Sequence, residues 1–228
     1  MVKAWQTLDQ LETAEGPIEL RQRGDKDFLI TVSGRVLMNS RASRSEEALA
    51  ELACLPIRDR SHPRVIIGGL GMGCTLRRAL DLLPPDASVA VCELNPTIAH
   101  WCQGPLAPVS DGALDDPRTE LIIGDVADQI RHLGDATKQG AADAIVLDLY
   151  EGPHSQTDAA ADPFYGSRAL LRTRKALKPG GVFGIWSEDP DRGYESRLHR
   201  AGFADWSLHR PGRGGRRHAV YIARAPLQ

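Results

Sequence analysis

The sequence predicts a fold of the α/β class: a doubly wound, mainly parallel sheet with a terminal antiparallel hairpin and a small N-terminal β extension. Three observations support this prediction. From residue 64 onward, short apolar runs alternate with helix-like segments, as in a parallel sheet with crossover helices. An apolar run at 65–67 leads directly into a glycine-rich turn at 68–73. Near the end, strand-like runs at 206–209 and 219–223 flank a glycine- and arginine-rich turn, which indicates a hairpin.

Two domains are expected: residues 1–60 as an N-terminal β extension with a linking helix, and residues 61–228 as the larger ligand-binding domain. Three runs in the first part are separated by polar or glycine-containing turns, as strands are. The helix that follows has an apolar stripe, with Ser45 as its N-cap candidate. The expected strands span 18–23, 28–32 and 35–38, and the expected helix spans 45–57.

Within residues 61–228, each expected strand is a short apolar run that is followed by a helix-like segment or by the hairpin. Residues 178–181, Lys-Pro-Gly-Gly, have the composition of a turn that ends a helix before the last parallel strand. The expected strands span 64–68, 88–93, 119–123, 143–148 and 181–186, and the expected helices span 74–83, 95–102, 126–133, 163–177 and 192–201.

The composition is that of an ordinary globular protein. The chain has 228 residues, 42% of them hydrophobic, and a formal net charge of −2, which gives no electrostatic reason to expect a nucleic acid or an anionic membrane as partner. No apolar run approaches the roughly 20 residues that span a bilayer. The first residues lack a signal peptide's apolar core, so a cytoplasmic protein is expected. The four cysteines form no Cys-x-x-Cys pair, which argues against a disulfide or a zinc site.

The glycine-rich turn and an acidic residue about 20 residues beyond it predict a bound nucleoside. Gly69, Gly71 and Gly73 follow the pattern Gly-x-Gly-x-Gly, without the longer dinucleotide spacing and without the Gly-Lys-Ser/Thr of a P-loop. The shorter pattern suits ligands of the S-adenosylmethionine type, which carry no phosphate. Glu93 ends the next strand, where a carboxylate can accept hydrogen bonds from both ribose hydroxyls. The alternative is a tight strand–helix turn whose glycines serve packing only.

Acidic residues also end two further strands, at the edge where open α/β sheets bind ligands. Asp125 either accepts the adenine amino group, caps the helix that begins at Val126, or does both. Asp148 begins a loop in which a carboxylate can remove or hold the proton of an attacking amine, unless the loop is merely solvated. The same loop contains Tyr150, Glu151 and His154.

The candidate site residues share a position in the glycine turn or at a strand end. For cofactor binding they are Gly69, Leu70, Gly71, Gly73, Glu93, Leu94, Asp125, Val126 and Asp148. For catalysis they are Asp148, Tyr150 and Glu151, and no metal site is expected. Whether His154 or Arg213 contacts a substrate is left open.

Several short segments follow one another in the order and spacing of a known family: Leu55 to Ile57, His62-Pro63, Val65 to Gly69, Asp116 to Arg118, Gly124-Asp125, Asp148 to Pro153 and Phe164-Tyr165. On these segments most of the chain, roughly residues 16–205, resembles the spermidine synthase (polyamine aminopropyltransferase) family, which has a Rossmann-like core of the class I methyltransferase type. The resemblance implies S-adenosylmethionine or its decarboxylated form as cofactor and a small-molecule acceptor. It also implies a homodimer, with Trp101 and the strands of residues 1–38 as candidate contacts.

Departures from the family's motifs shape the expected reaction. The acid of the family's glycine loop aligns with Gly71, and the tyrosine and polar residue that line its polyamine pocket align with Leu49 and Ala50. Without the loop acid, a donor that carries a carboxylate is no longer repelled. We therefore expect methyl transfer from S-adenosylmethionine to a small acceptor, whose identity the sequence does not give. The alternatives are aminopropyl transfer from the decarboxylated donor, with Asp148 or Glu46 holding its amine, and a non-catalytic nucleoside-binding module.

Overall fold

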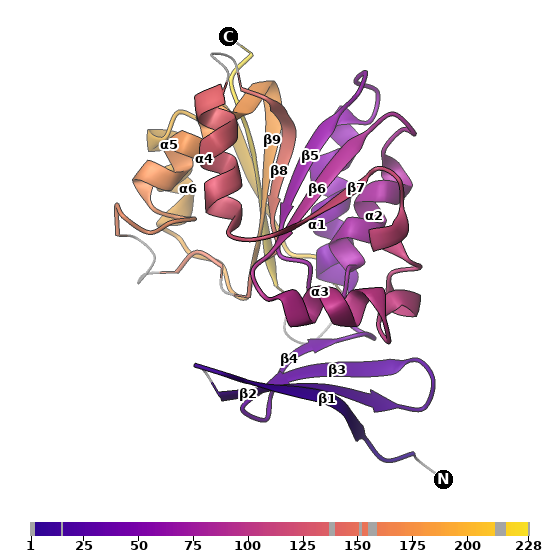
Figure 1. The fold of residues 1–228 in the computed structure, drawn as a ribbon. Helices are drawn as coiled ribbons and strands as arrows, with labels where there is room; N and C mark the ends of the chain where they lie inside the picture. Colours follow the sequence, from indigo (N-terminus) through magenta and orange to yellow (C-terminus); the bar gives the residue numbers. More distant parts are fainter. Residues whose placement is uncertain are drawn as a thin grey trace.

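A computed structural model describes residues 3–14, 16–136, 140–150, 152–154, 159–212 and 218–227. Within these ranges seven strands form the central sheet, in the order β10-β11-β9-β8-β5-β6-β7 (Figure 1). Strands β5 to β9 run parallel, whereas β11 pairs antiparallel with both β9 and β10. The strands are β5 (Arg64–Gly68), β6 (Ser88–Glu93), β7 (Thr119–Ile123), β8 (Ala142–Leu147), β9 (Leu177–Ser187), β10 (Asp205–His209) and β11 (Ala219–Arg224).

Helices cover both faces of this sheet and bury one apolar cluster on each. Leu49 of α1, Leu76 of α2 and Trp101 of α3 belong to the first cluster. Leu170 of α5 and Leu198 of α6 belong to the second. The helices are α1 (Arg44–Cys54), α2 (Cys74–Leu82), α3 (Pro96–Gln103), α4 (Val126–Ala136), α5 (Ser167–Ala176) and α6 (Tyr194–Arg200), with short 3-10 turns η1 (Leu55–Ile57), η2 (Ala107–Val109) and η3 (Ala113–Asp115). The predicted α/β class, mainly parallel sheet and terminal hairpin are confirmed.

The N-terminal part forms a separate antiparallel sheet of neighbouring strands, β1 (Gln6–Thr13), β2 (Gly16–Arg23), β3 (Asp27–Val32) and β4 (Arg35–Asn39). It lies beneath the carboxyl edge of the central sheet (Figure 1). Its buried side chains, Ile18 and Leu20 of β2 and Phe28 and Ile30 of β3, join the same apolar cluster as α1, α2 and α3. This shared core fixes the small sheet against the edge where ligands are expected. The division at residue 60 stays a prediction.

The sequence prediction missed β1 because its residues are almost all exposed and do not alternate between apolar and polar. The N-cap prediction was also wrong. Helix α1 begins at Arg44 after Ser43, and Ser45 is buried within its first turn. Residues 178–181 are not a turn but the first part of β9, whose pairing with β8 is irregular at that point. A bulged strand tolerates the proline and glycines that we interpreted as a turn.

Trp101 is not available for the dimer contact that we predicted. Its side chain is 1% exposed, and its Nε1 donates a hydrogen bond to Asp9 Oδ2 at 2.7 Å. This bond joins α3 to β1 within one chain and is the main cause that lowers the pKa of Asp9. The homodimer itself stays a prediction.

At the amino edge of the central sheet, a buried carboxylate accepts hydrogen bonds from several donors. Asp143 of β8 is 2% exposed and accepts hydrogen bonds from Arg60 Nη1 at 2.9 Å, Lys178 Nζ at 2.6 Å and the Arg64 backbone N–H at 2.8 Å. Burial alone would raise the pKa of Asp143, but these donors outweigh it and lower the pKa.

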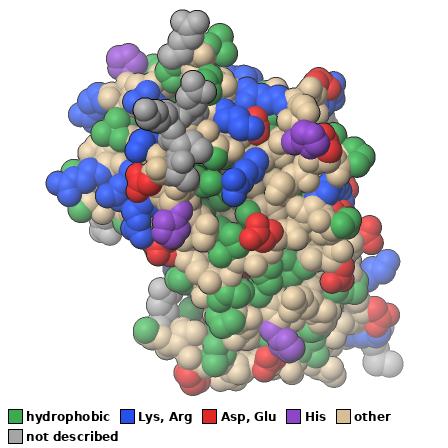
Figure 2. All heavy atoms as spheres, turned by 45° about the horizontal axis from the view of Figure 1, so that its top comes forward, with side chains coloured by type: hydrophobic (Ala, Val, Ile, Leu, Met, Phe, Trp, Pro, Cys, Tyr) green, Lys and Arg blue, Asp and Glu red, His purple; other side chains and the backbone are tan. Residues whose placement is uncertain are grey.

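In Figure 2, where this edge comes forward, Lys and Arg side chains gather over the upper part of the face, with acidic side chains between them.

Replacing Asp143 by Asn tests how much the charge of this carboxylate stabilises the fold. Asp143→Asn keeps the side chain's shape but removes the charge that two cations share, so we expect a loss of about 1–3 kcal/mol of unfolding free energy at neutral pH. Urea unfolding followed by circular dichroism measures it. Asp59→Asn is the control, because the exposed Asp59 pairs only with its neighbour Arg58 among the described residues, and its replacement should cost about 0.5 kcal/mol or less. Equal stability of the two variants would contradict the structural role of Asp143.

Candidate functional site

The predicted site residues that the structure describes lie at or just beyond the carboxyl ends of β5, β6, β7 and β8. The strand order of the sheet changes direction between β5 and β8, which is where open α/β sheets bind ligands. The Asp148 backbone N–H donates to the Gly68 carbonyl at 2.8 Å, and the Gly69 N–H donates to the Cys92 carbonyl at 2.9 Å. These bonds continue the sheet past its regular end. They hold the glycine turn between the ends of β6 and β8.

The glycine turn needs its glycines for two physical reasons. Gly69, Gly71 and Gly73 have φ angles of +90°, +54° and +80°, in the region that side chains other than glycine rarely adopt. The backbone also passes close to its neighbours, because a Cβ at Gly69 would collide with the Asp148 carbonyl oxygen. At Gly71 the same space is occupied by the Met38 side chain of β4. The turn is therefore shaped by the loop after β8 on one side and by the N-terminal sheet on the other.

Glu93 anchors the turn from the end of β6. Its half-buried carboxylate accepts a hydrogen bond from the Leu70 backbone N–H at 3.1 Å and another from the Asn95 N–H at 2.8 Å. Each oxygen accepts one of these bonds, and a carboxylate retains further lone pairs for other donors. The group expected to bind a ribose therefore also fixes the backbone that would approach the nucleoside.

The other predicted residues at the strand ends differ in their burial and in their hydrogen bonds. Asp125 Oδ1 accepts a hydrogen bond from the Ala127 N–H at 2.8 Å, so Asp125 caps α4, one of the two roles considered for it. Val126 is buried and packs against Gly68, whereas Leu94 is 73% exposed beside Glu93. The Leu94 side chain is therefore accessible at this edge, whereas Val126 is part of the packing that holds Gly68, the first residue of the turn.

Asp148 is the most perturbed acid of the group. It is half-buried, and its Oδ2 accepts a hydrogen bond from Thr75 Oγ1 at 2.6 Å. Burial, and after it the negative charge of Glu46 on α1, raises the pKa of Asp148 to about 7, while the Thr75 hydrogen bond acts in the opposite direction. A carboxyl group that titrates near neutral pH beside a ligand-binding edge is suited to exchange protons with a substrate.

The loop after β8 also touches the N-terminal sheet. The Arg35 guanidinium of β4 lies 5.1 Å from the ring centroid of Tyr150, which is 43% exposed. Glu151 and Arg213 lie outside the described residues, so the structure gives no account of the predicted role of either. His154 is described and half-buried.

Two contributors were not among the candidate site residues. Glu46 was considered only as an alternative acid, and Thr75 was missed, although a polar residue in the first turn of a helix after a glycine loop is a usable signal. The two α1 residues that align with the family's polyamine-pocket positions, Leu49 and Ala50, are fully buried in the core. They pack the helix onto the sheet and do not line an open pocket.

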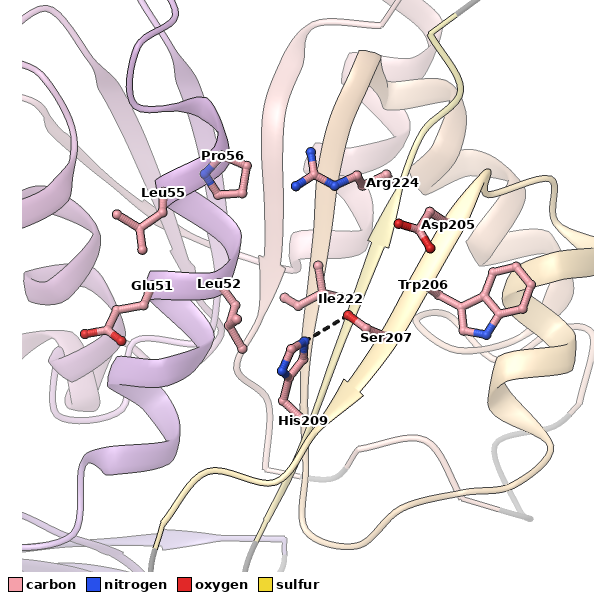
Figure 3. Close-up of a pocket in the computed structure, with 10 residues that line it drawn as sticks. All are labelled: Glu51, Leu52, Leu55, Pro56, Asp205, Trp206, Ser207, His209, Ile222 and Arg224. Atoms are coloured by element: carbon pink, nitrogen blue, oxygen red, sulfur yellow. Dashed lines mark hydrogen bonds between the residues drawn. The ribbon is translucent and has the colours of Figure 1, made fainter.

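A separate hollow of about 270 Å³ lies between α1 and the terminal hairpin (Figure 3). Leu52 of α1 faces Ile222 and His209 across it, and His209 Nε2 lies 2.8 Å from Ser207 Oγ. Its lining comes from α1, η1, β10 and β11 and includes none of the predicted site residues. In the described part of the chain, no cluster of His, Cys, Asp and Glu suits a metal ion, and no helix is long and apolar enough to cross a membrane.

Comparison with known proteins finds sequence relatives and structural neighbours, although no family model matches the chain. The chain is 25% identical over 174 residues to a polyamine aminopropyltransferase of Mycobacterium tuberculosis, covering 76% of the chain and 31% of that protein. It is 30% identical over 184 residues to the protein of the same name from Corynebacterium efficiens, covering 73% of the chain and 34% of that protein. The chain thus spans about a third of the length of these curated relatives.

Solved structures of spermidine synthases have the same fold as this chain. Spermidine synthase from Thermotoga maritima superposes with a TM-score of 0.76 at 20% identity, over 98% of this chain and 74% of that one. A spermidine synthase in complex with the transition-state analogue AdoDATO gives a TM-score of 0.75 over 98% of this chain and 73% of that one. The fold class is a Rossmann-like α/β sheet with an N-terminal β unit. The chain is spermidine synthase-like in sequence as well as in fold.

The comparisons overturn the predicted methyl transfer, and with it the methyltransferase class, because the curated relatives are named as aminopropyltransferases. They support the alternative that we gave second. The prediction failed because it relied on the missing acid at Gly71. In the structure Met38 occupies the space beside Gly71, while Glu46 and Asp148 place negative charge at the same edge. The absence of one carboxylate therefore did not identify the donor.

The close approach at Gly69 can be tested with a matched pair of glycines. Gly34 also has a positive φ, but a Cβ there would meet nothing within 4 Å. Gly34→Ala should therefore cost only the conformational term of about 1 kcal/mol, whereas Gly69→Ala should cost about 1–3 kcal/mol more because its Cβ overlaps the Asp148 carbonyl. Urea unfolding of both variants measures the difference. Equal losses would mean that the turn and the β8 loop are not in the contact described.

Proposed function

We propose that this protein transfers an aminopropyl group from decarboxylated S-adenosylmethionine to a small amine. One observation carries the proposal: Asp148, an acid with a pKa near neutral, lies against the glycine turn at the carboxyl edge of the sheet. The relatives' printed name, polyamine aminopropyltransferase, supports the kind of group transferred. Because the chain spans about a third of those relatives, the activity is proposed from this edge of the molecule and not from their names alone.

In this proposal the donor's nucleoside lies along the glycine turn. Glu93 accepts hydrogen bonds from the ribose hydroxyls while it holds the Leu70 N–H. Asp125 adds an acceptor for the adenine amino group while it caps α4. Exposed Leu94 covers one side of the base. The decarboxylated donor carries a free amine and no carboxylate, and it suits an edge where Glu46 and Asp148 supply negative charge.

The transfer step needs a neutral amine nucleophile. The acceptor arrives as an ammonium ion, and the Asp148 carboxylate takes one of its protons. The nitrogen lone pair then forms a C–N bond to the propyl carbon attached to sulfur. The C–S bond breaks, and its electron pair neutralises the sulfonium, so that 5′-methylthioadenosine leaves. Tyr150, with Arg35 over its ring, lies at the acceptor side of the loop.

Replacing Asp148 by Asn tests the base directly. Asp148→Asn is nearly isosteric but cannot take a proton, so turnover should fall about 10²-fold or more, while the affinity for 5′-methylthioadenosine, which lacks the donor's amine, changes little. Turnover is measured as 5′-methylthioadenosine formed from the decarboxylated donor with a panel of diamines. Because the carboxylate of Asp148 forms only above its pKa of about 7, wild-type turnover should rise with pH through that value.

Asp128→Asn provides the matched control, because Asp128 is exposed on α4 and pairs with Arg131. It should leave turnover and its pH profile as in wild type. Equal turnover in wild type and Asp148→Asn would contradict the catalytic role, and absence of 5′-methylthioadenosine with every diamine would contradict aminopropyl transfer.

A second test concerns the ribose. Glu93→Ala removes a charged acceptor from two hydroxyls, each such bond being worth about 1.5–3 kcal/mol, so the Kd for 5′-methylthioadenosine should rise at least about 10-fold. Calorimetry measures the Kd, and circular dichroism checks that the variant is folded. Glu120→Ala, an exposed acid on β7, is the control and should bind as wild type. An unchanged Kd in folded Glu93→Ala would remove Glu93 from the binding site.

A further inference from the structure

Thr75 connects three elements beneath the proposed site. It is the second residue of α2 and is 2% exposed. Its hydroxyl donates to Asp148 Oδ2 at 2.6 Å, and the same oxygen lies 3.4 Å from the backbone carbonyl oxygen of Glu46 in α1. The side chain therefore lies between the loop after β8 and the first turn of α1.

A threonine hydroxyl in this position can serve both protonation states of its neighbour. It carries one proton and two acceptor lone pairs. When Asp148 is ionised, the hydroxyl donates to Asp148, as the 2.6 Å distance indicates. When Asp148 is protonated, the carboxylic acid can donate to Thr75, and the threonine proton can turn to the Glu46 carbonyl. Neither state then leaves a buried polar group without a partner.

We propose that Thr75 is the positioning residue of Asp148: its hydroxyl fixes the orientation of this carboxylate and exchanges donor and acceptor roles when the carboxylate takes a proton. The importance of this role for turnover depends on the proposed aminopropyl transfer. The contact itself does not, because it joins two side chains of the chain's own fold.

Several groups act on the charge of Asp148. Glu46 faces it from α1, and its negative charge disfavours the ionised form, as burial does. Cys74 faces it from α2 and also lies near Glu46 and Glu47, but burial raises the pKa of its thiol to about 12, so it is neutral. Tyr150 and His154 lie on the same loop as Asp148. Of these interactions, the Thr75 hydrogen bond favours the carboxylate.

Removing the hydroxyl should therefore raise the pKa of Asp148. Thr75→Val keeps the shape of the side chain but cannot donate, and the loss of a hydrogen bond to a charged group corresponds to about one pKa unit or more. The acidic limb of the turnover profile should move upward by that amount, with at least about a 5-fold loss at pH 7 and most of the activity recovered near pH 9. Thr75→Ser retains a hydroxyl and should restore the wild-type position of the limb.

Controls separate this effect from a general disturbance. Thr173→Val removes an equally buried threonine hydroxyl from α5 and should leave the profile in place. A purely structural role for Thr75 would lower turnover by the same factor at pH 7 and pH 9, and this outcome would overturn the proposal. If Thr75→Val does not fold, Thr75→Ala, which also lacks the hydroxyl, takes its place.

A measurement without substrate distinguishes this inference from the proposed function. The carboxyl carbon of Asp148 can be titrated by NMR in protein labelled with ¹³C-aspartate, with Asp148→Asn identifying the signal. A midpoint that moves upward in Thr75→Val or Thr75→Ala supports the positioning role, even if wild type transfers no aminopropyl group and the proposed function fails. A midpoint that stays at its wild-type position overturns the positioning role, whether or not the protein is active.

Discussion

The site depends on one close approach, that of the glycine turn after β5 to the chain leaving β8. Gly69 lies so near the Asp148 carbonyl that a side chain at this position would overlap it. The approach is possible because parallel neighbouring strands deliver both segments to the same edge, and because glycine accepts the positive φ of the turn. It places an acid from one strand beside the binding loop of the next. In the proposed function, a ligand bound along the turn lies beside Asp148.

The surrounding groups stabilise this arrangement and set its charge. Glu93 ties the turn to β6 through the Leu70 N–H, and Met38 of the N-terminal sheet packs on Gly71 from the opposite side. Burial, and after it the charge of Glu46 on α1, raises the pKa of Asp148 to about 7. The N-terminal sheet and α1 thus border the proposed site, whereas the residues expected to bind the nucleoside come from the central sheet.

The sequence was sufficient to predict those elements that depend on a pattern of neighbouring residues. The five parallel strands, the hairpin and the glycine turn could be predicted because apolar runs and glycine spacing are local signals. β1 could not, since its exposed residues carry no periodicity. Thr75, Glu46 and Met38 could not be assigned either, because their contacts with Asp148 and Gly71 join segments that are distant in the chain. Methyl transfer was predicted wrongly for the same reason: one aligned position, Gly71, was considered without the acids that the fold brings to the same edge.

The most direct test of this account is an ¹⁵N NMR titration of the labelled protein with 5′-methylthioadenosine, the nucleoside that the proposed reaction releases. The account predicts that amide signals shift at the glycine turn, at Glu93 and Leu94, at Asp125 and Val126, and at Asp148, with the signals of Leu52, Ser207 and Ile222 unchanged. Shifts confined to those last residues would place the nucleoside in the hollow between α1 and the terminal hairpin. That result would contradict the assignment of the ligand site to the carboxyl edge of the sheet.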